Sequence, residues 1–235
     1  MIRNNVHILS TRPLPDRVIR QAAEGNIHIE VLSFIETRKR SDPELTKIIE
    51  GMKKKLLQVI FTSVNAVQAV IDELNGERPD WIIYCTGQTT RGIVEDYFGP
   101  ESIAGTASSS EELAESILQK APFNSFVFFC GDQRREELPG ILKESGYSLE
   151  VLVVYETLET PHKSNKHYDA ILFYSPSAVE SFFSMNNPEP GTILFAIGKT
   201  TAGEIAKHAN NPILIAEKPV KKLLAEQAIR YFQTI

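Results

Sequence analysis

The sequence predicts an α/β protein made of two similar lobes, each built on a parallel β-sheet. Short apolar runs alternate with helical patterns along the chain. These runs are continuous rather than alternating, which is typical of parallel strands covered on both faces. Two motifs also occur twice at nearly the same offset: VIFTSVNAV at residues 59–67 returns as ILFYSPSAV at 171–179, and IYCTGQTT at 83–90 returns as LFAIGKTT at 194–201. A repeat of this length suits a domain or half-domain rather than a solenoid unit.

The order of the elements follows from the same patterns. Apolar runs predict strands at residues 6–10, 29–33, 59–62, 81–85, 126–130, 151–155, 171–174, 193–196 and 213–216. Amphipathic spacing predicts helices at, for example, 16–24, 65–75, 111–120, 136–145, 201–208 and 220–232. A strand followed by a helix, repeated many times, builds parallel sheets through right-handed crossovers.

Two polar segments interrupt this rhythm at equivalent points of the repeat, at residues 34–42 and 156–165. Both are typical of connections between lobes. Two assemblies are then open. Either each lobe is one consecutive half of the chain, or the two ends of the chain pair with each other and enclose the middle. If both segments cross between the lobes, the enclosed arrangement is required.

The composition excludes several classes of protein. With 235 residues, of which 42% are apolar and 23% charged, the chain suits two ordinary globular domains. No apolar run is long enough to span a bilayer and no signal-like segment begins the chain, so we expect a cytoplasmic protein without a membrane partner. A net charge of −5 without a basic stripe argues against nucleic acid binding. The five histidines lack ligand spacing, so no metal is expected, and Cys85 and Cys130 are predicted to be buried thiols.

Small polar residues follow apolar strands at equivalent points of the two repeats. Ser63 and Asn65 stand between a predicted strand and a helix, and so do Ser175 and Ser177. Side-chain oxygens cap helices at such junctions, and the free N–H groups of the first turn bind carboxylate or phosphate. Ligands bind at this edge of open α/β sheets. Two interpretations are therefore open: these residues are only helix caps, or they also bind an anionic ligand.

The second repeated turn has similar chemistry. Glycine lets the backbone approach a ligand, and the neighbouring hydroxyls are uncharged donors. The turn is neither a GxGxxG loop nor a P-loop. Four such turns can hold a ligand with many anionic groups without lysines. The candidate residues of this second repeated turn are Thr86, Gly87 and Thr89 in the first copy and Gly198, Thr200 and Thr201 in the second copy.

Two further side chains are candidates for chemistry. Tyr155 ends an apolar strand where the chain leaves a lobe, so its phenol either exchanges a proton near the ligand or simply covers the domain edge. Arg135 follows a strand and either pairs with a carboxylate or is an ordinary surface arginine.

Six short segments or residue pairs form an ordered set over nearly the whole chain: 11–13 (TRP), 61–67 (FTSVNAV), Gly131 with Arg135, 154–157 (VYET), 169–179 (DAILFYSPSAV) and 196–202 (AIGKTTA). Taken together, this set resembles the uroporphyrinogen-III synthase family of tetrapyrrole biosynthesis, in which the motifs occur in the same order. Two positions differ from the family's usual pattern, because Cys130 stands where many members have arginine and Lys199 where proline is usual.

The resemblance implies the enclosed arrangement, with a two-stranded linker ladder and a cleft between the lobes. One domain would comprise residues 1–33 and 166–235, the other 43–150, and the linkers 34–42 and 151–165. It also implies the reaction: linear hydroxymethylbilane loses its hydroxyl as water, ring D is inverted, and the macrocycle closes as uroporphyrinogen III. No cofactor is implied, and we expect a monomer.

The resemblance and the turn chemistry together give an expected site. Tyr155 is the expected catalytic residue, because its phenol can assist departure of the hydroxyl. The expected substrate-binding residues are Arg12, Ser63, Asn65, Thr86, Gly87, Thr89, Gly131, Arg135, Ser175, Ser177, Gly198, Thr200 and Thr201. The alternative is a non-catalytic two-lobed binding or regulatory protein for an anionic metabolite.

Overall fold

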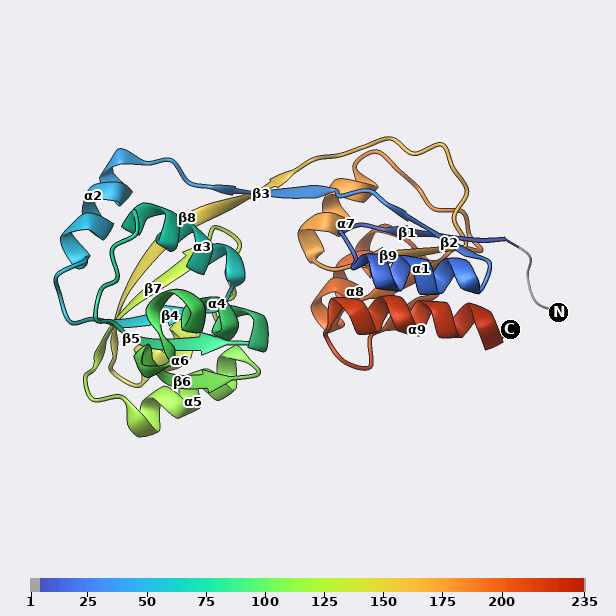
Figure 1. Cartoon of the computed structure of the whole chain (residues 1–235). Helices are drawn as coiled ribbons and strands as arrows, with labels where there is room; N and C mark the ends of the chain where they lie inside the picture. Colours follow the sequence, from blue (N-terminus) through green and yellow to red (C-terminus); the bar gives the residue numbers. More distant parts are fainter. Residues whose placement is uncertain (1–4, 235) are drawn as a thin grey trace. The chain divides into compact units, whose positions relative to one another are not determined.

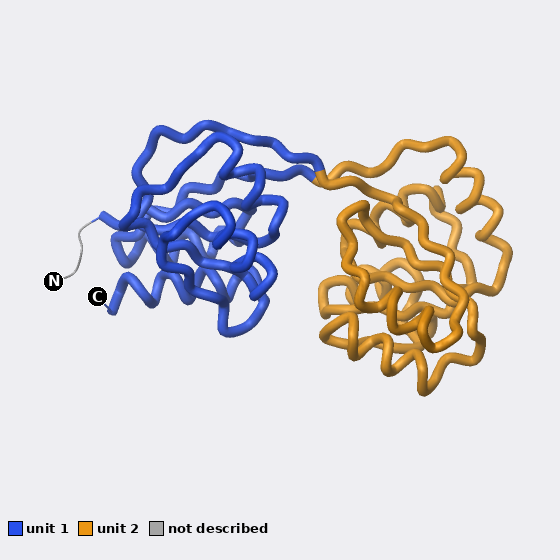
Figure 2. The backbone as a smooth tube through the Cα atoms, turned by 180° about the vertical axis from the view of Figure 1, so that it is seen from behind, with its two compact units in different colours: residues 1–36, 158–235 blue, residues 37–157 orange. Residues whose placement is uncertain are grey.

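The computed structural model describes residues 5–234, which fall into two compact units (Figures 1 and 2). Unit 1 consists of Met1–Glu36 and Leu158–Ile235, and unit 2 of Thr37–Thr157. Residues 1–4 and 235 of the expected discontinuous domain lie outside the described residues. Both ends of the chain therefore contribute to one unit, and the middle of the chain forms the other.

Unit 1 is a parallel sheet with helices on both faces. Its strands lie in the order β11-β10-β9-β1-β2, and each neighbouring pair is parallel. Helices α1 and α9 pack on one face and α7 and α8 on the other. The strands are β1 Val6–Ser10, β2 Ile27–Val31, β9 Ala170–Phe173, β10 Ile193–Ala196 and β11 Ile213–Ile215. The helices are α1 Asp16–Glu24, α7 Pro176–Phe183, α8 Lys199–His208 and α9 Lys221–Thr234.

Unit 2 has the same three-layer design. Its sheet has the order β3-β8-β7-β4-β5-β6, and the pairs from β8 to β6 are parallel. Helices α2, α3 and α4 cover one face, and α5 and α6 the other. The strands are β3 Ile35–Lys39, β4 Gln58–Phe61, β5 Ile82–Thr86, β6 Ile103–Ala107, β7 Ser125–Gly131 and β8 Ser148–Glu159. The helices are α2 Pro43–Met52, α3 Val64–Leu74, α4 Gln88–Phe98, α5 Ser110–Lys120 and α6 Glu137–Glu144, with a 3-10 turn at Pro100–Ser102.

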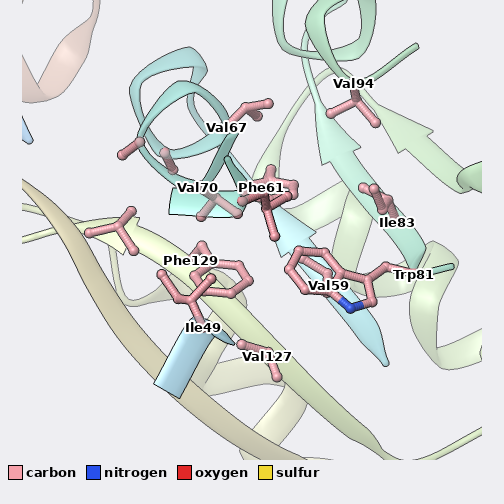
Figure 3. Packing of buried hydrophobic residues seen from close by; sticks show 14 of the residues in the cluster. Ile49, Val59, Phe61, Val67, Val70, Trp81, Ile83, Val94, Val127 and Phe129 are labelled. Carbon is pink, nitrogen blue, oxygen red and sulfur yellow. The ribbon is translucent and has the colours of Figure 1, made fainter. Parts of the chain in front are cut away.

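The strand sequences explain these layers. In β4, Val59 and Phe61 point to the face covered by α2–α4, whereas Ile60 points to the α5–α6 face, and all three are fully buried. A strand with apolar residues on both faces needs a helical layer on each side. Figure 3 shows Phe61, Trp81 and Phe129 packed together on the α2–α4 side. The continuous apolar runs therefore predicted the α/β class correctly.

Strands β3 and β8 form the predicted two-stranded ladder. The amide of Arg40 donates to the carbonyl of Val154 at 3.0 Å, and the amide of Thr160 donates to the carbonyl of Phe34 at 2.9 Å. Because residue numbers rise on one strand as they fall on the other, this pair is antiparallel. The boundaries between the two units fall inside these strands, after Glu36 and after Thr157.

The structure corrects four strand predictions. β2 runs over Ile27–Val31 instead of 29–33. β8 runs over Ser148–Glu159 instead of 151–155, and β3 lies in a segment expected to be a connection. β3 (IETRK) and the two ends of β8 (SLE and ETLE) contain mostly polar residues, so they lack the apolar run that predicts a strand although the backbone is extended. The edge strand β6 was missed because its sequence, IAGTA, is small and only half-buried.

No helix within residues 5–234 is long and apolar enough to cross a membrane.

Candidate active site

The first repeated turn follows β4 in unit 2. Ser63 has extended backbone angles, and its Oγ accepts a hydrogen bond from the amide of Ala66 at 3.2 Å. It is therefore the N-cap of α3. Asn65 lies in the first turn of α3 and is half-buried. The cap holds α3 so that Asn65 stands at the carboxyl end of the sheet.

The second turn follows β5. Gly87 has φ +81°, in the left-handed region that favours glycine, and its amide donates to the carbonyl of Ala107 at 3.0 Å. The Thr86 hydroxyl donates to the carbonyl of Thr62 at 3.3 Å, which joins the turn to the end of β4. Thr89 is exposed in the first turn of α4. The backbone thus requires the glycine of this copy, and Thr89 keeps an accessible hydroxyl.

Tyr155 is placed by an irregularity in the pairing of β7 with β8. Cys130 pairs with Val153 but Gly131 pairs with Tyr155, so β8 has one extra residue at Val154. Tyr155 is half-buried and lines a pocket of about 140 Å³ together with Asn65 and residues of α3 and β3. The structure therefore brings two of the predicted site residues, Asn65 and Tyr155, into one pocket.

Sequence reasoning missed the other polar side chains of this pocket, which are Thr37, Arg38, Lys39, Gln68 and Asp72. Gln68 follows Asn65 by three residues and so faces the same side of α3, a spacing that could have revealed it. Its Nε2 donates to Asp72 Oδ1 at 2.9 Å. Lys39 pairs with Glu73 at 2.6 Å. Burial by itself raises the pKa of Glu73, but the hydrogen bonds from Lys39 and Thr46 and the positive charges of Lys39 and Lys53 together keep this pKa below its usual value. Lys39 belongs to the segment expected to be a linker.

The loop after β7 carries the third group of predicted residues in unit 2. Asp132 Oδ1 accepts hydrogen bonds from the amides of Gln133 and Thr157, both at 3.0 Å, and so ties this loop to β8. Arg135 is exposed, whereas Arg134 pairs with Glu136 at 2.9 Å. Arg135 is thus the arginine of this loop whose guanidinium is more accessible.

The corresponding turns of unit 1 repeat part of this geometry. Ser175 Oγ accepts from the amide of Ala178 at 3.2 Å as the N-cap of α7 and contacts the hydroxyl of buried Ser177 at 3.2 Å. Before α8, Gly198 has φ −173°, which any residue adopts. Thr200 is exposed there, but Thr201 is only 2% exposed. In this copy Thr200, and not Thr201, offers a hydroxyl to solvent.

Arg12 follows β1 at the carboxyl end of the unit 1 sheet. The hydroxyl of Ser10 donates to the Arg12 carbonyl at 2.7 Å and fixes the backbone there. The pKa of Lys221, the first residue of α9, is lowered, chiefly by desolvation and also by the positive charge of Arg12. Two cations thus share this region, at a helix N-terminus that also favours anions.

Residues 18–226 match the family model described as uroporphyrinogen-III synthase HemD. The chain belongs to the uroporphyrinogen-III synthase family. This is a family of cyclising hydro-lyases of heme biosynthesis that act on hydroxymethylbilane. The match confirms the predicted enzyme class and favours it over a non-catalytic binding protein.

Two solved structures show that the synthase fold is shared. A mutant uroporphyrinogen III synthase from the extremely thermophilic bacterium Thermus thermophilus is similar with a TM-score of 0.64 at 16% identity, over 97% of this chain and 99% of that chain. The enzyme from Helicobacter pylori has a TM-score of 0.64 at 19% identity, over 96% and 99% of the two chains. The likeness confirms the predicted two-lobed α/β fold.

We expect the two cysteines of the synthase to be unreactive in the folded state. Burial raises the pKa of both Cys85 and Cys130 to about 11, so the reactive thiolate is scarce near neutral pH. At pH 8, iodoacetamide should label the native protein far more slowly than protein unfolded in urea. Because the folded pKa values are raised, the stability they contribute is complete below about pH 9 and is lost as the pH rises through about 11. Rapid labelling of native protein would contradict this burial.

Substitutions in the two kinds of turn should separate capping from substrate binding. Ser63→Ala should lower the free energy of unfolding by about 1 kcal/mol, because α3 loses its N-cap bond. Thr200→Val should leave stability nearly unchanged but weaken substrate binding by about 1 kcal/mol, because an exposed donor is lost. Thermal melts and the KM of the synthase measure the two effects. Unchanged kinetics in both variants would show that these residues do not bind substrate.

Proposed function

We propose that this synthase uses Tyr155 to protonate the hydroxyl that leaves hydroxymethylbilane, and that donors at the strand ends hold the carboxylates of the substrate. The observation that carries the proposal is the pocket in which Tyr155 lies beside Asn65 at the carboxyl end of the unit 2 sheet. A phenol is neutral near pH 7 and has one proton to donate. Within residues 5–234 no histidine lines this pocket, and Asp72 is the only carboxylate that does.

The proposed reaction starts with proton transfer and loss of water. The phenol of Tyr155 donates its proton to the hydroxyl of the hydroxymethyl group, the C–O bond breaks, and water leaves. The pyrrole nitrogen supplies the electron pair that stabilises the carbon left behind. Ring D attacks this carbon through its substituted α-carbon and forms a spiro intermediate. The bond between that α-carbon and the neighbouring methylene bridge then breaks and re-forms at the other α-carbon, and the proton that this second α-carbon loses returns to the phenolate. The reaction then needs neither oxidant nor reductant.

Substrate binding in this proposal relies on neutral donors and a few cations. A chain of net charge −5 can hold many carboxylates if hydroxyl and backbone N–H groups meet them. The accessible candidates are Thr89, Arg135 and Thr200, and Arg12 adds a cation close to Lys221. Ser177 and Thr201 are buried, so in this proposal they hold the backbone of their turns in place instead of contacting the substrate. The remaining proposed contacts are Ser63, Asn65, Thr86, Gly87, Ser175 and Gly198.

The proposal also covers domains, assembly and location. We infer a discontinuous domain of residues 1–33 and 166–235 and a continuous domain of 43–150, joined by linkers 34–42 and 151–165. Each unit buries apolar clusters on both faces of its own sheet, so neither needs a second chain to cover it. We propose a cytoplasmic monomer as the working form. Analytical ultracentrifugation at the working concentration tests the monomer, and a dimer in that experiment would contradict this part of the proposal.

The test of the proposed function is turnover of hydroxymethylbilane generated in situ. The synthase should yield the type III isomer of uroporphyrinogen. A protein that only binds the bilane would leave the spontaneous type I product, and that result would overturn the proposal. The same reaction without protein is the matched control for the spontaneous reaction.

A further inference from the structure

The extra residue in β8 changes the face on which Tyr155 lies. Earlier in the strand, Val151 and Val153 pack against the α5–α6 cluster, and Leu152 and Val154 against the α2–α4 cluster. Regular alternation would put the next side chain, Tyr155, on the α5–α6 side. Instead it packs on the α2–α4 side, directly after Val154. The bulge therefore turns the phenol towards α3 and Asn65.

Gly131 leaves the space that the turned ring occupies. In β7, Val127 and Phe129 belong to the α2–α4 cluster, so residue 131 faces the same side. A Cβ atom on Gly131 would lie 2.4 Å from Tyr155 Cζ, 2.6 Å from Cε2 and 2.8 Å from the hydroxyl oxygen. The end of the phenol thus lies directly over the Gly131 backbone.

The backbone itself does not require glycine at this position. Among the described glycines, those with positive φ are Gly76, Gly87, Gly99 and Gly146, and Gly131 is not one of them. Alanine fits the local conformation of β7, and the three atoms nearest to its Cβ would all belong to the Tyr155 side chain. A methyl group here would therefore displace the ring and leave the strand in place.

We propose that Gly131 is a positioning residue for Tyr155: the bulge at Val154 turns the phenol to the α3 side, and the missing side chain of Gly131 lets it lie at the carboxyl end of β7. This inference rests on the proposed role of Tyr155 in proton donation. Gly131 is among the substrate-binding residues expected from the sequence; in this proposal its role is to leave space for the side chain of Tyr155.

The first experiment compares two Gly→Ala variants in the same unit. Gly131→Ala should lower kcat about tenfold with little change in KM, because a small misplacement of a catalytic group is costly. Gly105→Ala is the matched control, since its Cβ would lie 2.9 Å from Cδ1 of Tyr84, a tyrosine buried in the α5–α6 cluster. Gly105→Ala should lower the melting temperature but keep kcat. Wild-type kcat in Gly131→Ala, alongside a slowed Tyr155→Phe enzyme, would overturn the positioning role and leave the role of Tyr155 intact.

The second experiment is a double-mutant cycle with Tyr155→Ala. Without the ring, Gly131→Ala has nothing to displace and should cause no further loss of turnover. An equal loss in both backgrounds would mean that Gly131 contacts the substrate directly, and the proposal would be wrong. If Gly131→Ala alone does not fold, the double variant should fold again, and its failure to do so would also overturn the proposal. Wild-type turnover in the Tyr155→Phe variant would refute a different hypothesis, the role of Tyr155 as proton donor, and this result does not depend on the double-mutant cycle.

Discussion

Tyr155→Phe should lower the kcat of the synthase by roughly one to two orders of magnitude, as expected for loss of general acid assistance. We place the effect at the low end of this class because a hydroxymethyl pyrrole ionises readily. The ring of Tyr155 packs against the α2–α4 cluster and phenylalanine retains that contact, so fold and substrate affinity should survive. Single-turnover measurement of product formation separates this loss from changes in binding.

The control for this variant is Tyr147→Phe. Tyr147 lies in the same unit but packs on the α5–α6 side, before the start of β8. The Tyr147→Phe variant also loses a phenolic hydroxyl, but it should keep wild-type turnover. The product of Tyr155→Phe should remain mainly type III, because isomer choice comes from holding the ends of the bilane. A switch to type I would mean that Tyr155 positions ring D, and wild-type turnover would end the proton-transfer hypothesis.

Phe129→Ala should reduce the free energy of unfolding of unit 2 by about 3–5 kcal/mol, the usual cost of deleting a large core ring. Phe129 is fully buried, and its ring stacks on Phe61 at 5.6 Å and on Trp81 at 5.9 Å between centroids (Figure 3). The alanine variant leaves a cavity between two packed rings that cannot easily collapse. Trp81 is the only tryptophan, so its fluorescence during urea unfolding reports on this unit.

Phe123→Ala is the matched control for the core substitution. Phe123 lies in the same unit but is 54% exposed, so its removal should change stability by no more than about 0.5 kcal/mol. A loss below about 1 kcal/mol in Phe129→Ala would contradict the dense packing of this core.

The strand-end turns show how far sequence reasoning about the site extends. The repeated motifs located Ser63 and Ser175 correctly at helix starts, because capping is a local interaction between a side chain and the amide three residues on. The same motifs treated Thr200 and Thr201 alike, although one is exposed and the other buried. Helix rotation against the sheet decides that difference, and it depends on packing partners far away in the sequence.

The sequence by itself determined the fold class and the family. Apolar runs without alternation require helices on both faces of a sheet, and this signal is carried by neighbouring residues. Only the tertiary structure decided on which face Tyr155 lies and that its phenol occupies the space where residue 131 has no side chain. A bulge of one residue reverses every following side chain, yet it arises from the pairing of β7 with β8 and leaves no pattern in either strand alone. The residue expected to do the chemistry was visible in the sequence, whereas its orientation was set by contacts between strands.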